Sequence, residues 1–172
     1  EVESPLYHLK NLSKQKRLNR SLSKKKKGSQ GRKKAKLQLA KLHIKTANQR
    51  RDYFHKLSNQ LANNYDNIFI EDLNMKAMQM MWGRKISDLA FSEFINILEY
   101  KAKVTKIDRF FPSSKTCSNC GAVKKDLDLN TRVFKCDTCY FEIDRDLNAS
   151  INIKRVGAST LAGEVVRATS VA

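Results

Sequence analysis

The sequence predicts a mixed α/β protein with long basic helices and an inserted zinc ribbon formed by four cysteines. Three observations lead to this fold class. Apolar residues recur at helical spacing through the basic first third of the chain, short apolar runs typical of buried strands follow, and two Cys-x-x-Cys pairs lie in the last third. With 172 residues, 41% of them hydrophobic, we expect one modest core with appendages.

The positive charge of the chain is concentrated towards its N-terminus. Residues 4 to 60 hold 18 Lys and Arg against one acid, Asp52, while the remaining chain is close to neutral. Each phosphate that a cation neutralises releases condensed counterions, so this segregation favours a polyanion and predicts nucleic acid as the partner. The expected contacts are Lys14, Arg17, Arg20, Lys24, Lys25, Lys26, Lys27, Arg32, Lys33 and Lys34.

The sequence also limits where the protein works. An anionic membrane surface could attract the same cations, but no run of about 18 apolar residues could span a bilayer. The N-terminus has no secretory signal pattern. We therefore expect a cytoplasmic protein without a membrane partner, in a reducing compartment where cysteines bind metal rather than form disulfides.

Residues 1–64 predict a basic helical segment. A first helix is expected from Ser4 to about Arg20, where leucines recur among Lys and Arg. The stretch from Ser21 to Gly31 has no apolar periodicity and predicts a flexible loop. A long second helix is expected to about Asn63. Its apolar stripe, which we expect to pack on a partner, is Leu37, Ala40, Ile44, Ala47, Phe54, Leu57 and Leu61.

Residues 65–111 predict strands and a helix. An apolar run from Asn67 to Leu73 predicts a buried strand that ends in acids, and Val104 to Ile107 predicts another. Between them, a helical pattern runs from Ile86 to about Lys101.

The remainder of the chain predicts a ribbon, a helix and a tail. Residues 112–143 form the expected zinc ribbon, with strands between Asp128 and Phe134. A closing helix is expected within residues 144–158, from Arg145 to about Val156, and residues 159–172 are expected to be a disordered tail.

The four cysteines have the spacing of a metal site. Two residues separate Cys117 from Cys120, and Cys136 and Cys139 repeat the pair after fifteen intervening residues. Tetrahedral Zn²⁺ takes four such sulfurs at about 2.3 Å. Because protein would fill all four positions, the zinc is expected to be structural and to fold a segment too short to bury its own core.

Two carboxylates have two interpretations each. Glu71 follows a predicted strand, where a polar end would explain it, and Asp146 begins a predicted helix, where capping of free amides would explain it. If both instead converge on Mg²⁺ or Mn²⁺, they form part of a metal site that cleaves phosphodiesters.

Four ordered motifs resemble the C-terminal part of TnpB proteins, the transposon-associated accessory proteins of insertion sequences. The motifs are Ile70-Glu71-Asp72-Leu73-Asn74, Cys-Ser-Asn-Cys-Gly at 117–121, Phe-Lys-Cys-Asp-Thr-Cys at 134–139, and Asp-Arg-Asp-Leu-Asn-Ala-Ser-Ile-Asn-Ile at 144–153. The resemblance covers nearly the whole chain. It implies an RNA-guided DNA endonuclease whose RuvC nuclease domain has an RNase H-like fold, with the zinc ribbon inserted before the last acidic motif.

The resemblance also implies roles for the acids. Glu71 matches the second acid of the RuvC site and Asp146 the third, with Mg²⁺ or Mn²⁺ as the catalytic ion. Asp146 is preferred to Asp144 because it belongs to the Asp-x-Asn-Ala motif, although spacing alone does not separate them.

The family's first catalytic Asp lies on an opening strand, and we expect this chain to lack that segment, because the sequence from Glu1 onward contains no match to it. We therefore expect a partial RNase H-like domain that binds DNA and guide RNA without efficient cleavage. Two alternatives stay open: a non-catalytic zinc-ribbon module that binds DNA or RNA, and a protein that transfers DNA strands.

Overall fold

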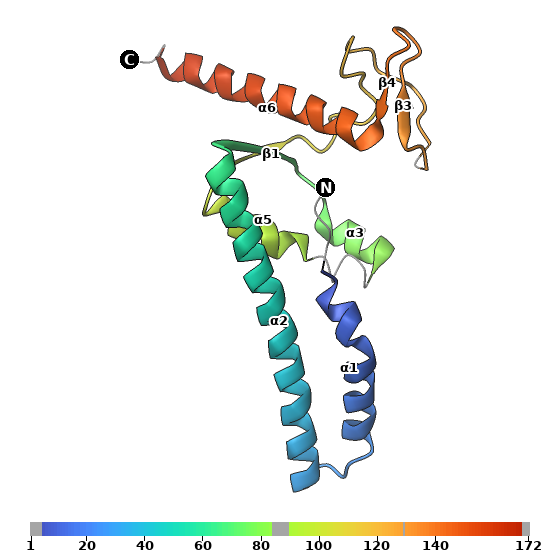
Figure 1. The fold of residues 1–172 in the computed structure, drawn as a ribbon, viewed down its shortest axis with the longest axis vertical. Coiled ribbons are helices and arrows are strands. Elements are labelled where there is room, and N and C mark those ends of the chain that lie inside the picture. The colour runs from blue at the N-terminus through green and yellow to red at the C-terminus, as the bar shows by residue number, and fades with distance from the viewer. Residues whose placement is uncertain (1–4, 84–89, 129, 170–172) are drawn as a thin grey trace. The chain divides into compact units, whose positions relative to one another are not determined.

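The computed structural model describes residues 5–83, 90–128 and 130–169 and contains both helices and strands, as predicted (Figure 1). The chain divides into two compact units rather than the expected single body. The first unit, Glu1–Asp66 with Met75–Ala102, is helical, and the second, Asn67–Asn74 with Lys103–Ala172, contains both sheets. Strand pairing gathers β1 and β2 into the second unit, so the expected segment 65–111 is divided between the two.

A hairpin of two helices, α1 (Tyr7–Ser23) and α2 (Gln30–Asn64), forms most of the first unit (Figure 1). Both helices are predicted by the sequence. The two helices pack against each other, and Ala35 and Leu42 of α2 are buried, seven residues apart on one helix face.

The loop between α1 and α2 is shorter than the flexible segment expected from Ser21 to Gly31. Ser29 caps α2, because its hydroxyl accepts a hydrogen bond of 3.2 Å from the amide of Arg32. The guanidinium of Arg32 donates in turn to the carbonyl of Leu22 at 2.8 Å, and to a loop carbonyl. The end of α1 is thereby joined to the start of α2.

The buried face of α2 differs from the predicted stripe in its first half. Leu37 and Ile44 are 56% and 59% exposed, since α1 covers the neighbouring face of the helix. The second half follows the prediction more closely: Phe54 is buried, and its ring lies 5.5 Å from that of Phe94, centroid to centroid.

Two shorter helices complete the first unit. Helix α3 (Met75–Trp82) was not expected from the sequence, and α5 (Phe91–Glu99) lies within the predicted helix, whose beginning at residues 86–89 falls outside the described residues. Helix α5 packs on α2, where Glu93 pairs with Arg50 and Arg51 at 3.3 Å each.

A parallel pair of strands begins the second unit. Strand β1 (Asn67–Glu71) pairs with β2 (Lys103–Ile107) in a register that places Glu71 opposite Ile107. Both strands are predicted by the sequence. Parallel strands end at the same edge of their sheet, so Glu71 lies beside the loop that follows β2.

The ribbon lies between β2 and the last helix. Its antiparallel strands β3 (Val133–Lys135) and β4 (Glu142–Asp144) enclose a small core, in which Phe134 is completely buried with Cys117 beside it. Strand β3 overlaps the end of the stretch from 128 to 134 in which the strands were expected, and β4 lies beyond it.

The last helix, α6, is longer than expected. It runs from Arg145 to Thr169, past the predicted end at Val156 and into the segment expected to be disordered. The predicted helix stops just before Gly157, and a Cβ atom at Gly157 would overlap the ring of Phe69 in β1. Because glycine has no Cβ atom, α6 can pass close to β1 at this position. Helix-favouring residues such as Ala158 then continue the helix.

We predict that Gly157→Ala destabilises the second unit by about 1–3 kcal/mol, because the new methyl group must displace Phe69. Thermal unfolding followed by circular dichroism measures this. Gly163→Ala on the same helix is the matched control: a Cβ there meets nothing within 4 Å, so the change should be neutral or stabilising by up to about 1 kcal/mol. Equal effects at both positions would contradict the close approach.

Candidate metal centres and nucleic-acid surface

The four predicted cysteine ligands converge on one point. Their sulfur atoms all lie within 4.8 Å of one another, with 3.7 Å between Cys117 and Cys139 and 3.6 Å between Cys120 and Cys136. A zinc ion with four sulfurs at about 2.3 Å separates them by about 3.8 Å, whereas a disulfide holds sulfurs at about 2.05 Å. The arrangement therefore fits four metal ligands and not disulfides.

The same backbone turn presents each cysteine pair. In each turn the amide of the first cysteine donates to the carbonyl five residues later, at 2.8 Å for Cys117 and 2.9 Å for Cys136. The residue after the second cysteine adopts a positive φ, which is 79° for Gly121 and 59° for Tyr140. A tyrosine pays a steric cost there that a glycine avoids, so glycine marked only the first turn in the sequence.

Charge around the sulfurs favours a cation at their centre. Amides of Cys139 and Thr138 donate to the Cys136 sulfur and lower its pKa to about 6. The amide of Ala122 favours the Cys120 thiolate, but the hydrogen bond with Cys139 and other neighbouring groups raise the pKa of Cys120 to about 12. Clustered thiolates resist ionising together, and a divalent cation removes that conflict.

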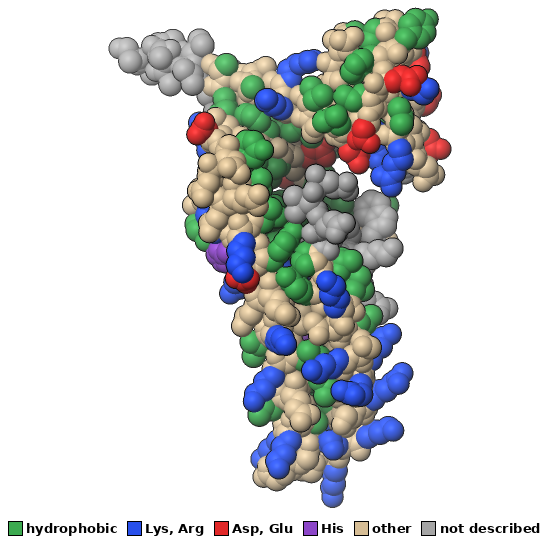
Figure 2. Space-filling view, viewed as in Figure 1, with side chains coloured by type: hydrophobic (Ala, Val, Ile, Leu, Met, Phe, Trp, Pro, Cys, Tyr) green, Lys and Arg blue, Asp and Glu red, His purple; other side chains and the backbone are tan. Residues whose placement is uncertain are grey.

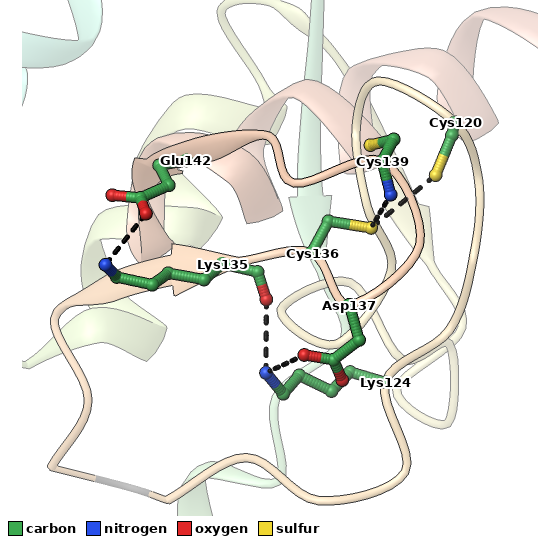
Figure 3. A network of polar contacts seen from close by, with 7 residues as sticks. All are labelled: Cys120, Lys124, Lys135, Cys136, Asp137, Cys139 and Glu142. Carbon is green, nitrogen blue, oxygen red and sulfur yellow. Dashed lines mark hydrogen bonds and ion pairs between the residues drawn. The ribbon is translucent and has the colours of Figure 1, made fainter.

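Ion pairs brace the ribbon around the second cysteine pair (Figure 3). Lys124 donates to the carbonyl of Lys135 at 3.1 Å and to the carboxylate of Asp137 at 2.8 Å. The ammonium of Lys135 pairs with Glu142 across β3 and β4 at 2.7 Å. Both lysines therefore have partners within the ribbon.

We predict that a metal chelator unfolds the ribbon while the helical hairpin of the first unit stays folded, because the ribbon's own core is small. Circular dichroism should show a partial loss of signal, and limited proteolysis should cut within residues 112–144. The control is reductant without chelator. Unfolding by reductant alone would indicate disulfides, and an unchanged ribbon after metal removal would contradict a structural metal.

Glu71, the first predicted acid, is tied to the last helix. It is partly buried at the end of β1, and its carboxylate accepts a hydrogen bond from the hydroxyl of Ser113. Ser113 is only 6% exposed, and its carbonyl accepts a hydrogen bond of 2.9 Å from the side chain of Asn152 in α6. A short chain of contacts therefore connects Glu71 to the helix that carries Asp146.

The same helix is fastened to the ribbon. Asn148, Asn152 and Arg155 lie on one face of α6, at spacings of four and three. The first two donate to the carbonyl of Thr116 at 2.7 and 2.6 Å, Asn148 accepts from the amide of Ser118 at 2.9 Å, and Arg155 donates to the Ser118 carbonyl at 2.7 Å. Both asparagines are buried with their amides satisfied, so the ribbon sets the position of α6.

Asp144 and Asp146, which spacing alone could not separate, have different surroundings. The carboxylate of Asp144 caps α6, accepting hydrogen bonds of 2.9 Å from the amides of Asp146 and Leu147. The side chain of Asp146 is 73% exposed and lies 3.4 Å from the Arg145 guanidinium. The capping role considered for Asp146 therefore belongs to Asp144, and the Asp146 carboxylate is open to solvent.

Two other acids near Glu71 serve the adjoining loop. Asp72 pairs with Arg109, and Asp108 accepts a hydrogen bond of 2.9 Å from the amide of Phe110. Glu71 and Asp146 lie in the same unit, where α6 packs against both β1 and β2. Their function as a metal-binding pair stays a prediction.

The ten predicted nucleic-acid contacts all lie on the α1–α2 hairpin, over which Lys and Arg gather in Figure 2. Arg32 differs from the rest, because its guanidinium closes the loop of the hairpin. Sequence reasoning missed Lys41 and Lys45 of α2, which line a groove with Lys14 and Arg17 of α1. Their spacing of four on one helix face was the available signal.

No helix in the part of the chain that the structure describes has both the length and the apolar content to cross a membrane. The fold and the site define a basic protein of helices and strands, with a ribbon whose four clustered cysteines can hold a metal ion.

Comparison with known proteins identifies the family. Residues 1–81 match a family model described as a probable transposase, and residues 91–153 match one described as the Cas12f1-like TNB domain. A Streptomyces pristinaespiralis protein named "Putative RNA-guided DNA endonuclease" is 37% identical across 97% of this chain. The chain belongs to the TnpB family, as its motifs predicted.

Further similar proteins support the same family assignment. TnpB-like protein L79 of Acanthamoeba polyphaga mimivirus is 33% identical over 75% of this chain and 27% of its own length. A cryo-EM structure of the Cas12f1–sgRNA–target DNA complex shares the fold, with a TM-score of 0.51 and 22% identity over 86% of this chain and 41% of that chain. The chain spans less than half the length of these proteins, including 43% of the Streptomyces relative.

Proposed function

We propose that this chain is the nucleic-acid-binding part of a TnpB-type RNA-guided DNA endonuclease, in which Glu71 and Asp146 bind Mg²⁺ or Mn²⁺ and zinc holds the ribbon. One observation carries the proposal. Glu71 is linked through Ser113 to α6, which begins with Asp146, and that second carboxylate stays open because Asp144 caps the helix.

The fold of the second unit supports a RuvC-type, RNase H-like assignment. Two parallel strands bring an acid to one edge of a sheet, and a helix packs against both strands. The structural likeness to the Cas12f1 chain supports the same assignment at the level of fold.

The two acids suit the chemistry of phosphodiester cleavage. Bound Mg²⁺ ions stabilise the charge that develops on the attacking and leaving oxygens, and they prefer carboxylate ligands. Glu71 and Asp146 would hold the ions. Ser113 fixes one oxygen of Glu71 and so directs the other, while the ribbon sets the position of the helix that carries Asp146.

The basic hairpin suits a protein that leaves sequence reading to a guide RNA. In such complexes base pairing selects the target, and the protein holds the backbone through its charge. The Lys and Arg side chains of the hairpin can contact phosphates whatever the base sequence, so DNA and guide RNA are the proposed partners.

We predict that the zinc-loaded chain binds Mn²⁺ and that Glu71→Gln or Asp146→Asn weakens this binding more than about tenfold, since each change removes an anionic ligand. Calorimetry and Mn²⁺ paramagnetic resonance measure the affinity. Asp126→Asn, at an exposed acid of the ribbon, is the control and should leave binding unchanged.

Two results would count against the metal site. Wild-type protein that binds no Mn²⁺ would favour the non-catalytic zinc-ribbon module. Equal losses of Mn²⁺ affinity in Glu71→Gln, Asp146→Asn and the control Asp126→Asn would mean that only the overall negative charge matters. In a longer protein with its guide RNA, Glu71→Gln should abolish Mg²⁺-dependent DNA cleavage and leave target binding intact.

We predict that Ser113→Ala weakens Mn²⁺ binding by about 10- to 100-fold, because Glu71 loses the hydroxyl that orients it. Ser113→Thr keeps a hydroxyl and should restore most of the affinity. Thermal unfolding of both variants separates orientation from folding. A variant that loses stability but keeps wild-type Mn²⁺ affinity would make Ser113 only a packing residue.

A further inference from the structure

A groove lies between the two helices of the basic hairpin, wholly within the first unit. Its volume is about 420 Å³, and a second hollow of about 330 Å³ shares part of its wall. The lining residues of the groove are Lys14, Arg17, Leu18, Gln38, Lys41, Leu42 and Lys45. Cations thus form both walls, two from α1 and two from α2, and all four are exposed.

The groove has no nearby counter-charge from its own helices. The sequence contains no Asp or Glu between residues 4 and 51, so neither α1 nor the first half of α2 can supply one. Cations farther along α2 do have acid partners: Arg50 and Arg51 pair with Glu93, and Lys56 pairs with Asp52 at 2.8 Å. The positive potential of the groove is therefore directed at an external anion.

The spacing of the cations suits a repeating anion. Lys14 and Arg17 are three residues apart and Lys41 and Lys45 four, which places each pair about 4.5–6 Å apart along its helix axis. Long flexible side chains extend from both walls. A single phosphate or a small anion would engage only part of this array, whereas a polymer with regularly spaced charges can engage all of it.

The lining of the groove favours contact with the sugar–phosphate backbone of a nucleic acid rather than with its bases. Leu18 and Leu42 form the apolar floor, along which the stems of the basic side chains can lie. The described lining residues include no aromatic ring, and aromatic rings are what single-strand binders use to stack bases. Contacts from Lys and Arg to phosphate without base stacking are typical of duplex backbones.

We propose that the groove between α1 and α2 binds the sugar–phosphate backbone of a nucleic acid duplex, independently of its sequence. Lys14 and Arg17 contact phosphates from one wall, and Lys41 and Lys45 from the other. The inference rests on the proposed nucleic-acid binding of this chain. It names the surface and the form of nucleic acid, and it does not depend on the metal site at Glu71.

The test compares two pairs of substitutions that remove equal charge. Lys41→Gln with Lys45→Gln alters the groove, while Lys16→Gln with Lys36→Gln alters exposed cations of α1 and α2 that do not line it. Glutamine favours helices about as well as lysine, so the hairpin should stay folded, as circular dichroism would verify. Fluorescence anisotropy measures binding of a labelled blunt DNA duplex of arbitrary sequence, across a salt series and without added Mg²⁺.

The wild-type log K should fall linearly with log salt concentration. The groove pair should reduce the magnitude of that slope by about 1.8, which is about 0.9 for each lost phosphate contact. The control pair should change the slope by less than about 0.5, because non-contacting cations release few counterions. The affinity for a single strand of the same length should fall less than the affinity for the duplex.

Three results would overturn the inference. Equal changes in the salt slope for the groove pair and the control pair would mean that overall charge, not the groove, determines binding. If the groove pair loses more affinity for the single strand than for the duplex, the groove binds unpaired nucleic acid. Wild-type protein that binds neither form would refute the proposed nucleic-acid function as well. Because wild-type binding is measured first, failure of the groove and failure of the proposed function are distinguishable.

Discussion

The second unit depends on one interaction, the attachment of α6 to the carbonyl of Thr116 by the buried side chains of Asn148 and Asn152. Thr116 directly precedes the first cysteine, so a metal that organises the ribbon also sets where α6 begins. Losing either amide would leave buried polar groups without partners, at a cost of about 1–3 kcal/mol each. The same helix then passes close to β1 because Gly157 has no side chain to meet Phe69.

This arrangement gives the ribbon a role in the proposed nuclease site, although a metal bound by all four cysteines would have no open position for catalysis. Asn152 also holds the carbonyl of Ser113, whose hydroxyl contacts Glu71. The candidate catalytic carboxylate is thus two contacts away from α6 and three from the turn that carries Cys117. The basic hairpin belongs to the other unit, so the cations proposed to hold nucleic acid and the acids proposed to bind the catalytic ions lie in different compact units of the chain.

Some residues have roles in the structure that their type and spacing in the sequence did not indicate. Arg32 was expected to contact nucleic acid, which stays a prediction, and its guanidinium has a structural use that the sequence did not indicate, since it donates to the carbonyl of Leu22 at the end of α1. Leu37 and Ile44 were expected in the buried stripe, but α1 covers the face of Ala35 and Leu42. Apolar residues occur on two neighbouring faces of α2, and periodicity does not say which face a partner will cover.

The sequence by itself determined the family, the strands β1 and β2, the two long helices and the four cysteine ligands. These follow from local spacing, because a Cys-x-x-Cys turn and an apolar run are defined by residues close together in the chain. Only the tertiary structure decided that Asp144 rather than Asp146 caps α6, that Ser113 reaches Glu71, and that lysines of two helices share a groove. Those outcomes depend on contacts between residues far apart in sequence, which no local pattern encodes.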